Sequence, residues 1–313
     1  MDETPHARGE ALRHFQRARR RAVRDQLAGR MTGKDTRMLP FETIRSELRK
    51  QNPMYRGVQE IPTDQIVGSV GRYREFTRKF LPLNDSLQER WVNVDSLAST
   101  KGWPPIAAYE IGGAYFVRDG NHRVSVAREL NIPSIEAHVW AFPGNVHISP
   151  DDKLDDVLIR LGEERFMEQT RLNEWCPDHG IRFTSPGRYT ELLAQIHNLR
   201  NILAQIDGEP LPYEEAVKAW YEMVYLPTIQ VIRDNDLLAG FPGCTEADLF
   251  VWLSKYRALL RETYGEYDNL AELARMLADK HKESGLNKIT RQIRRWLGSD
   301  ELPPLADPEL DNR

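Results

Sequence analysis

The feature that most constrains the fold is a hairpin that leads directly into a glycine turn and a helix. Apolar and aromatic residues predict strands over 106–111 and 114–117, and the two glycines between them suit a tight turn. Residues 118–123 (Arg-Asp-Gly-Asn-His-Arg) follow without a gap, and 124–130 have helical spacing. A strand end, a glycine turn and a helix start are therefore expected within a few residues of one another.

This order is typical of phosphate sites. Gly120 allows a tight turn and close approach of a ligand, while the first N–H groups and the dipole of the next helix favour an anion. Arg123 offers a planar fork for two phosphate oxygens, and His122 can donate a hydrogen bond. Asp119 or Asn121 could hold a metal ion or its bound water. The alternative is that the turn is purely structural, since such turns are common.

A second glycine turn, over 68–72, precedes this region. Ser69 and Arg72 in that turn are candidates for the same phosphate site. Arg72 and the basic residues after it could instead form a solvated face, which is the usual fate of a charge run. Nearby, 60–67 has a strand-then-turn pattern, 94–100 is helical and 135–140 is a final strand. These patterns predict an α+β domain over 56–145.

The chain after this domain is predicted to be all-α. Helical periodicity covers most of 146–300. The expected helices span 151–174, 187–206, 212–236, 245–263, 266–282 and 285–297. Pro227 predicts a kink or a split in the third of them, and Thr245 is the expected N-cap of the fourth. Residues 301–313 are acidic and Pro-rich, and are expected to be a flexible tail.

Residues 1–55 are predicted to be a basic helical arm, over 9–30, followed by an anchor helix over 40–50. Residues 1–50 contain 13 Lys and Arg against 7 Asp and Glu, although the whole chain has a formal net charge of −4. The candidate nucleic-acid contacts are Arg17, Arg20, Arg21 and Arg24. Such an arm could grip DNA phosphates without reading bases, or it could pack on the acidic remainder of the chain.

Composition limits the other classes of function. There is no apolar run long enough to cross a membrane and no secretory signal, so we expect a cytoplasmic protein with no membrane partner. Two cysteines cannot make a disulfide framework, and they suit a reducing compartment. Cys176 and His179 have the spacing of half a zinc site, but no second pair accompanies them, so no metal site is predicted.

Residues 120–123 (Gly-Asn-His-Arg) resemble three related motifs. These are the Gly-Cys-His-Arg signature of sulfiredoxins, the Gly-Glu-Arg-Arg box of ParB partition proteins and the Asp-Gly-His-His-Arg motif of free-serine kinases. The resemblance extends to 61–66, which is similar to the opening ParB strand, to 97–105 before the hairpin, and to 131–135 at the closing strand. It implies a small ParB/sulfiredoxin-like mixed-sheet domain. The whole chain resembles bacterial ParB-like proteins and transcriptional regulators.

The resemblance implies that the domain binds ATP or CTP with Mg²⁺. Gly120, Asn121, His122 and Arg123 would contact the phosphates, and Arg72 stands where ParB proteins have an arginine after their first turn. The expected function is a nucleotide-binding, DNA-associated regulator, which could form a homodimer. The alternative is an NTP-dependent phosphotransferase or NTPase acting on a small molecule, with Asp119 and His122 as catalytic residues.

Departures from these families narrow the chemistry. Asn121 stands where sulfiredoxins have their reactive cysteine, so the reductase reaction lacks its nucleophile. The glutamate that free-serine kinases use after the first strand has no counterpart in 67–71, and the second ParB box has no clean match. A nuclease gains no support, because the sequence has no evident carboxylate cluster for a metal.

Overall fold

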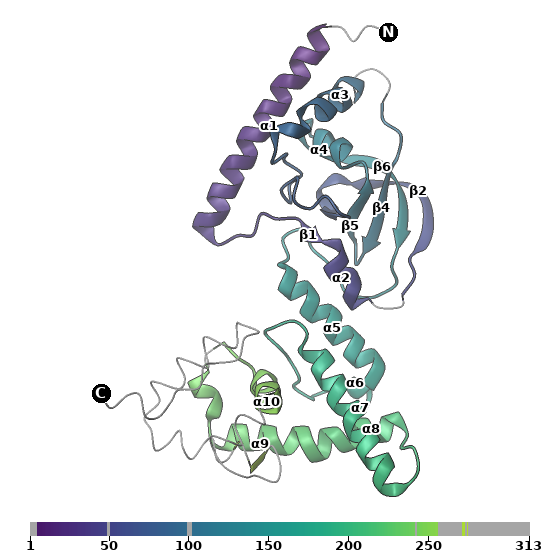
Figure 1. The fold of residues 1–313 in the computed structure, drawn as a ribbon, viewed down its shortest axis with the longest axis vertical. Helices are drawn as coiled ribbons and strands as arrows, with labels where there is room; N and C mark the ends of the chain where they lie inside the picture. Colours follow the sequence, from purple (N-terminus) through teal and green to yellow (C-terminus); the bar gives the residue numbers. More distant parts are fainter. Residues whose placement is uncertain are drawn as a thin grey trace, which may run out of the picture. The chain divides into compact units, whose positions relative to one another are not determined.

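In the computed structural model the chain forms two compact units, Met1–Leu161 and Gly162–Arg313 (Figure 1). The structure describes residues 5–48, 51–98, 102–241, 243–255, 271, 272 and 274. The expected helices over 266–282 and 285–297 and the tail over 301–313 fall outside this part of the chain, apart from those last three residues. No helix within it is both long and apolar enough to cross a membrane.

The first unit contains a six-stranded mixed sheet, as expected for an α+β domain. The strands are β1 (Leu39–Pro40), β2 (Met54–Pro62), β3 (Ile66–Ser69), β4 (Ile106–Ile111), β5 (Ala114–Asp119) and β6 (Ser134–Ala141). Their order in the sheet is β1-β3-β5-β4-β6-β2. The β4/β5 and β2/β6 pairs are antiparallel, whereas β1/β3, β3/β5 and β4/β6 are parallel. The chain therefore crosses over repeatedly, and strands distant in sequence become neighbours.

The hairpin predicted from the two glycines is confirmed. Ile111 pairs with Ala114 across the turn, and Gly112 and Gly113 have φ of 57° and 84°. A Cβ atom on Gly112 would lie 1.9 Å from the carbonyl oxygen of Val146, so that position has room only for glycine.

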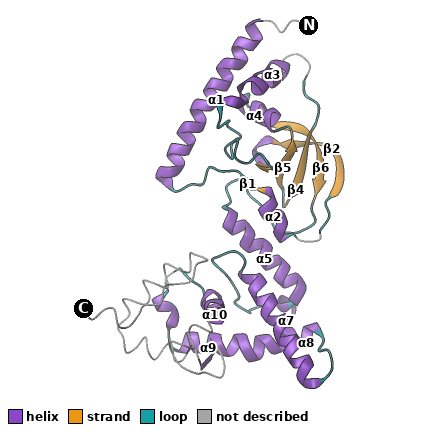
Figure 2. Ribbon diagram, viewed as in Figure 1, coloured by secondary structure: helices purple, strands orange, loops and turns teal. Residues whose placement is uncertain are grey.

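Three helices cover one face of the sheet (Figure 2). They are α1 (Pro5–Thr32), α3 (Gln88–Ala98) and α4 (Asn121–Glu129). Phe15 of α1 and Trp91 of α3 are almost fully buried, with ring centroids 5.6 Å apart. The Trp91 indole N–H donates to Ser125 of α4 at 2.8 Å. The predicted basic arm thus contributes Phe15 to the core of the first unit.

The other face of the sheet packs against α2 (Phe41–Glu47) and the beginning of α5 (Leu154–Thr170). Phe41 stacks on Tyr109 of β4, with centroids 4.8 Å apart and ring planes 9° from parallel. Val157 and Leu161 join the same core. The anchor helix predicted over 40–50 is therefore present, and its apolar stripe lies against the sheet.

The regular secondary structure of the second unit is helical in its described residues. Its helices are the rest of α5, α6 (Leu172–Trp175), α7 (Arg188–Asp207), α8 (Tyr213–Trp220), α9 (Leu226–Asp234) and α10 (Glu246–Lys255). A π-helical turn, Tyr221–Tyr225, joins α8 to α9 just before Pro227, which supplies no N–H to the helix ladder. Trp220 and Tyr225 are buried in the core beside Phe250.

Thr245 caps α10 as predicted. Its hydroxyl accepts a hydrogen bond from the Asp248 amide at 3.1 Å, and the Asp248 carboxylate accepts one from the Thr245 amide at 2.9 Å. This reciprocal pair satisfies two amides that a helix start leaves open.

Several element boundaries differ from the expected ones. β2 begins at Met54 rather than near residue 60, α3 begins at Gln88 rather than 94, and α4 begins at Asn121 rather than 124. The α4 difference follows from Gly120, whose left-handed backbone lets the helix start immediately after it. Residues 256–263 of the helix expected over 245–263 lie outside the described chain.

Candidate functional site

The turn between β5 and α4 is built around Gly120. Its φ of 105° lies in the left-handed region, and an added Cβ would stand 2.5 Å from Cγ2 of Ile106 and 3.1 Å from Nε of Arg123. Glycine is therefore required both for conformation and for space. Val124 is the first residue whose amide donates back to the turn, to the Gly120 carbonyl at 3.1 Å. The amides before it form the open, electropositive start of α4.

Two side chains in the first turn of α4 are buried without partners. Asn121 and His122 are each only 5% exposed. The Oδ1 atom of Asn121 and both ring nitrogens of His122 accept or donate no hydrogen bond to any described residue. A buried polar atom in this condition costs about 1–3 kcal/mol unless a ligand or water satisfies it. This unsatisfied polarity distinguishes the turn from an ordinary strand-to-helix connection.

The electrostatic environment of His122 is positive. Burial and, to a smaller extent, the nearby charges of Arg90 and Arg72 together lower the pKa of His122 to about 4. The imidazole is therefore neutral at pH 7, with one nitrogen as donor and the other as acceptor. The edge of the ring lies against Phe76, at a centroid distance of 5.5 Å. A helix start, two arginines and a neutral donor converge here, which suits an anion.

The motif predicts that Arg123 holds phosphate oxygens, but its guanidinium binds other groups of the chain. Its Nη1 atom donates to the carbonyl oxygens of Pro104 and Pro105, at 2.6 and 2.9 Å, and its Nη2 atom donates to Asp119 at 2.6 Å. The guanidinium therefore braces the turn against the segment before β4. Asp119 is mostly exposed apart from this ion pair.

The second glycine turn contributes unequally. Ser69 is fully buried at the end of β3, where its hydroxyl donates to the carbonyl of Val117 at 3.2 Å, so it is committed to the sheet. Arg72 is part-exposed and pairs with Glu75 at 2.8 Å, within electrostatic range of His122. Arg90 of α3 was missed by the sequence analysis. It is exposed, and no described residue forms an ion pair with it.

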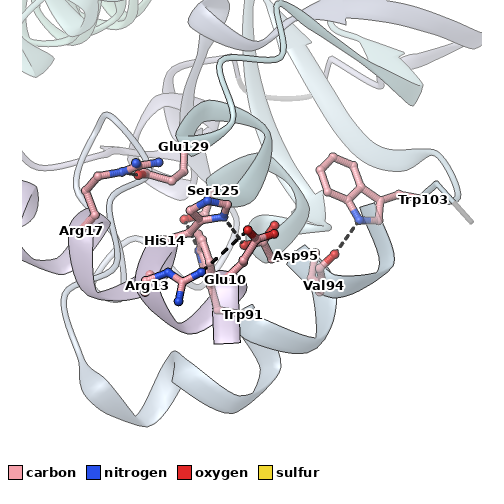
Figure 3. Close-up of polar contacts among 10 residues, drawn as sticks. All are labelled: Glu10, Arg13, His14, Arg17, Trp91, Val94, Asp95, Trp103, Ser125 and Glu129. Carbon is pink, nitrogen blue, oxygen red and sulfur yellow. Dashed lines mark hydrogen bonds and ion pairs between the residues drawn. The ribbon is translucent and has the colours of Figure 1, made fainter. Parts of the chain in front are cut away.

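The basic arm contains two kinds of arginine. Arg17 and Arg21 both donate to the carboxylate of Glu129 at the end of α4, and the Glu129 side chain is 1% exposed. Figure 3 shows Arg17 reaching Glu129 and, one turn earlier, His14 of α1 meeting Asp95 of α3, with Nδ1 and Oδ2 2.8 Å apart. The carboxylates of Asp95 and Glu129 thus attach α1 to α3 and to α4.

Arg20 and Arg24 lie on the solvent side of α1. Both are exposed, and the Nε atom of Arg20 bonds only the Gln16 carbonyl of its own helix, at 3.3 Å. The two interpretations of the arm, as a packing helix and as a solvent-facing basic strip, thus apply to different faces of the same helix.

A cavity of about 560 Å³ opens at the other end of α4, but its charged walls already have partners. The half-buried Arg128 donates to the carbonyls of Thr63, Ile66 and Arg78. Burial lowers the pKa of Arg128 to about 10, which leaves it charged at pH 7. Lys34 and Lys79 in the same walls form ion pairs with Asp151 and Asp25. The basic side chains of this cavity therefore hold the fold together, whereas the start of α4 has polar atoms without partners.

Metal-ligating side chains do not cluster in the described chain. No three His, Cys, Asp or Glu side chains there come together as a metal site would require. Cys176 contacts the Tyr221 hydroxyl at 3.4 Å, while Nδ1 of His179 accepts the Ile181 amide at 2.9 Å, so each member of that pair is otherwise engaged.

Comparison with known proteins adds no family: no protein-family model matches the chain, and no curated protein matches its sequence.

Proposed function

We propose that the chain is a ParB-like nucleotide-binding protein, in which the start of α4 holds the phosphates of ATP or CTP. The observation that carries this proposal is the pair of buried side chains, Asn121 and His122: Oδ1 of Asn121 and both ring nitrogens of His122 have no hydrogen-bond partner among the described residues. They stand at a glycine turn that no other residue could adopt without strain. An anion with several acceptor oxygens would satisfy donors there and meet the positive end of the helix.

Each residue of the turn has a distinct part in this proposal. The open amides of α4 and a ring N–H of His122 would donate to phosphate oxygens, and the amide group of Asn121 would add a further polar contact. Arg90 and Arg72 would supply positive charge without needing a bidentate grip. Arg123 and Asp119 are positioning residues, because their ion pair holds the turn. Mg²⁺ would arrive with the nucleotide and neutralise part of its charge.

DNA association is the second part of the proposal. Arg20 and Arg24 present positive charge on the open face of α1. Contacts of this kind give affinity through phosphate neutralisation and do not discriminate bases. Arg17 and Arg21 of α1 form ion pairs with Glu129 at the end of α4, and the proposed nucleotide turn lies at the start of the same α4 helix. That connection would let nucleotide occupancy influence the arm.

An enzyme is the alternative, favoured by one observation. The neutral imidazole of His122 could accept a proton from a substrate hydroxyl or water, and the exposed carboxylate of Asp119 lies at the end of the preceding strand. The reaction would then be phosphoryl transfer or nucleotide hydrolysis, and turnover of ATP or CTP would distinguish it from regulation.

Calorimetric titration of ATP, CTP and GTP with Mg²⁺ tests the proposal. We expect binding of ATP or CTP that Asn121→Asp abolishes, because a carboxylate at that position would repel phosphate. Arg90→Gln should weaken binding several-fold, whereas Arg45→Gln, the same change on α2 across the sheet, should leave it unchanged. Absence of binding by all three nucleotides, or equal effects of the two arginine variants, would reject the site.

A further inference from the structure

Aromatic side chains form a row across the face of the sheet that α2 covers only in part. Trp140 of β6 is paired in register with Tyr109 of β4 on one side and with Tyr55 of β2 on the other. Ring centroids are 6.3 Å apart for Tyr109 and Trp140, and 5.1 Å apart for Tyr55 and Trp140. His138 completes the group, with its Nδ1 atom 2.7 Å from the Tyr55 hydroxyl. We call these four residues the aromatic platform.

The platform becomes more open toward the edge strand β2. Tyr109 lies under Phe41 of α2, but Trp140 and His138 are only half-buried and Tyr55 is 53% exposed. Val58, which is opposite His138 on the same face, is 50% exposed. Apolar and aromatic surface of this extent on a sheet is unusual for a face that meets only solvent.

Positive charge accompanies the rings. The guanidinium of Arg118, on β5, stands 5.5 Å from the Trp140 ring centroid. Arg118 and Arg56, on β2, are both exposed, and neither forms an ion pair with any described residue. Two acidic residues of this face, Glu60 and Glu136, are paired with each other at the opposite end of the β2/β6 pair. The platform thus has an aromatic, basic end where anionic groups would be favoured.

This surface is separate from the α4 turn. Successive side chains of a strand point to opposite faces, and Phe116 and Val117 of β5 belong to different cores. The Arg118 guanidinium meets Trp140 on the face of Phe116, whereas α4 covers the face of Val117. A ligand on the platform would not compete with a nucleotide at the turn.

We propose that the aromatic platform binds single-stranded nucleic acid. Unpaired bases have flat π-faces that stack on exposed aromatic rings, and an adjacent arginine can contact the phosphate between stacked bases. Tyr55 provides an exposed ring, Trp140 a half-buried ring beside it, and Arg118 provides the charge. Duplex nucleic acid does not fit, because its bases are stacked on one another and their faces are not available.

Fluorescence anisotropy with labelled ten-nucleotide oligomers tests this inference. Oligo(dT) and oligo(U) are titrated separately into the full chain, and tighter binding of one of them identifies DNA or RNA as the partner. We expect Trp140→Ala and Tyr55→Ala each to weaken binding about 5- to 100-fold. Tyr73→Ala is the matched control, since Tyr73 is also an exposed tyrosine beside an arginine, at 5.6 Å from Arg74, but it lies outside the sheet.

Two further measurements keep the test decisive. Circular dichroism must show that each variant keeps its fold. If Trp140→Ala does not, the test relies on Tyr55→Ala, because Tyr55 is the more exposed of the two residues. Arg20→Gln/Arg24→Gln should weaken oligomer binding less than Tyr55→Ala does, while it weakens duplex binding. The inference is overturned if neither oligomer binds, if Tyr73→Ala has the same effect as Tyr55→Ala, or if only the α1 variant loses the oligomer. It is also overturned if the platform variants instead dissociate a dimer seen by sedimentation.

Discussion

The Nη1 atom of Arg21 on α1 lies 3.0 Å from Oε2 of Glu129 at the end of α4. Arg17 donates to the other oxygen of the same carboxylate, so this almost fully buried charge has two cationic partners. A buried carboxylate is expensive unless it is paired. The contact explains why a helix rich in arginine lies on the domain instead of extending into solvent, and it makes α1 sensitive to changes in α4.

The double variant Arg17→Gln/Arg21→Gln should lower the free energy of unfolding. It leaves the Glu129 charge buried without a full cationic partner, for which we expect a loss of about 2–3 kcal/mol in urea unfolding. Arg20→Gln/Arg24→Gln is the control on the open face and should change stability by less than about 0.5 kcal/mol. Equal losses in the two variants would mean that the Glu129 contact does not hold α1.

Duplex DNA binding should depend on the other pair of arginines. Arg20→Gln/Arg24→Gln should weaken binding and reduce the slope of log K against log salt by up to about 2, since each neutralised phosphate contributes about 0.9. Anisotropy titrations of a labelled duplex at several salt concentrations measure this slope. If it is the same in the variant and the wild type, α1 is not the DNA-binding surface.

Gly120→Ala should destabilise the first unit and remove nucleotide binding. Both backbone strain and a collision with Ile106 oppose the added methyl group. Gly57→Ala is a matched control, because Gly57 also has positive φ, 86°, but has open space around it. We expect the Gly120 variant to lose at least about 1 kcal/mol more than the control in thermal or urea unfolding. A smaller difference would show that the turn can relax around a Cβ.

His122 should make stability fall as the pH is lowered. Its pKa is about 4 in the folded protein, against 6.5 for an ordinary histidine, so between these values the unfolded chain binds more protons than the folded one. Stability therefore rises with pH through this window and is reduced at pH 5 relative to pH 7. We expect His122→Gln to lose about 1–2 kcal/mol less than the wild type over that change. Parallel losses in the two proteins would exclude a buried neutral histidine.

Much of the local architecture could be predicted from residues close together in the chain. The Gly112-Gly113 turn produced the β4/β5 hairpin, and the glycine at 120 produced a helix start, because both depend on backbone conformations that glycine alone adopts easily. The Thr245 cap and the break near Pro227 follow from equally local hydrogen bonding. Element boundaries were less accurate, since packing extends or shortens a helix beyond its periodic core.

The composition of the candidate site was decided by tertiary structure. Sequence alone determined the turn at Gly120, with Asn121 and His122 directly after it. Only the fold brought Arg90 of α3 near His122, directed Arg123 to backbone carbonyls and enclosed Ser69 in the sheet. Local patterns specify which way a chain turns, because that depends on adjacent dihedral angles.

The arginines of α1 also show that tertiary structure decides which side chains are available for binding. Arg17 and Arg20 look alike in the sequence, yet one meets a buried carboxylate 112 residues away and the other faces solvent. An arginine has the same local signature in both settings, and the distinction arises only when α1 is packed against α4. The sequence determined that the helix is basic, and the tertiary structure decided which of its charges remain available, because pairing depends on distances in space that no local pattern contains.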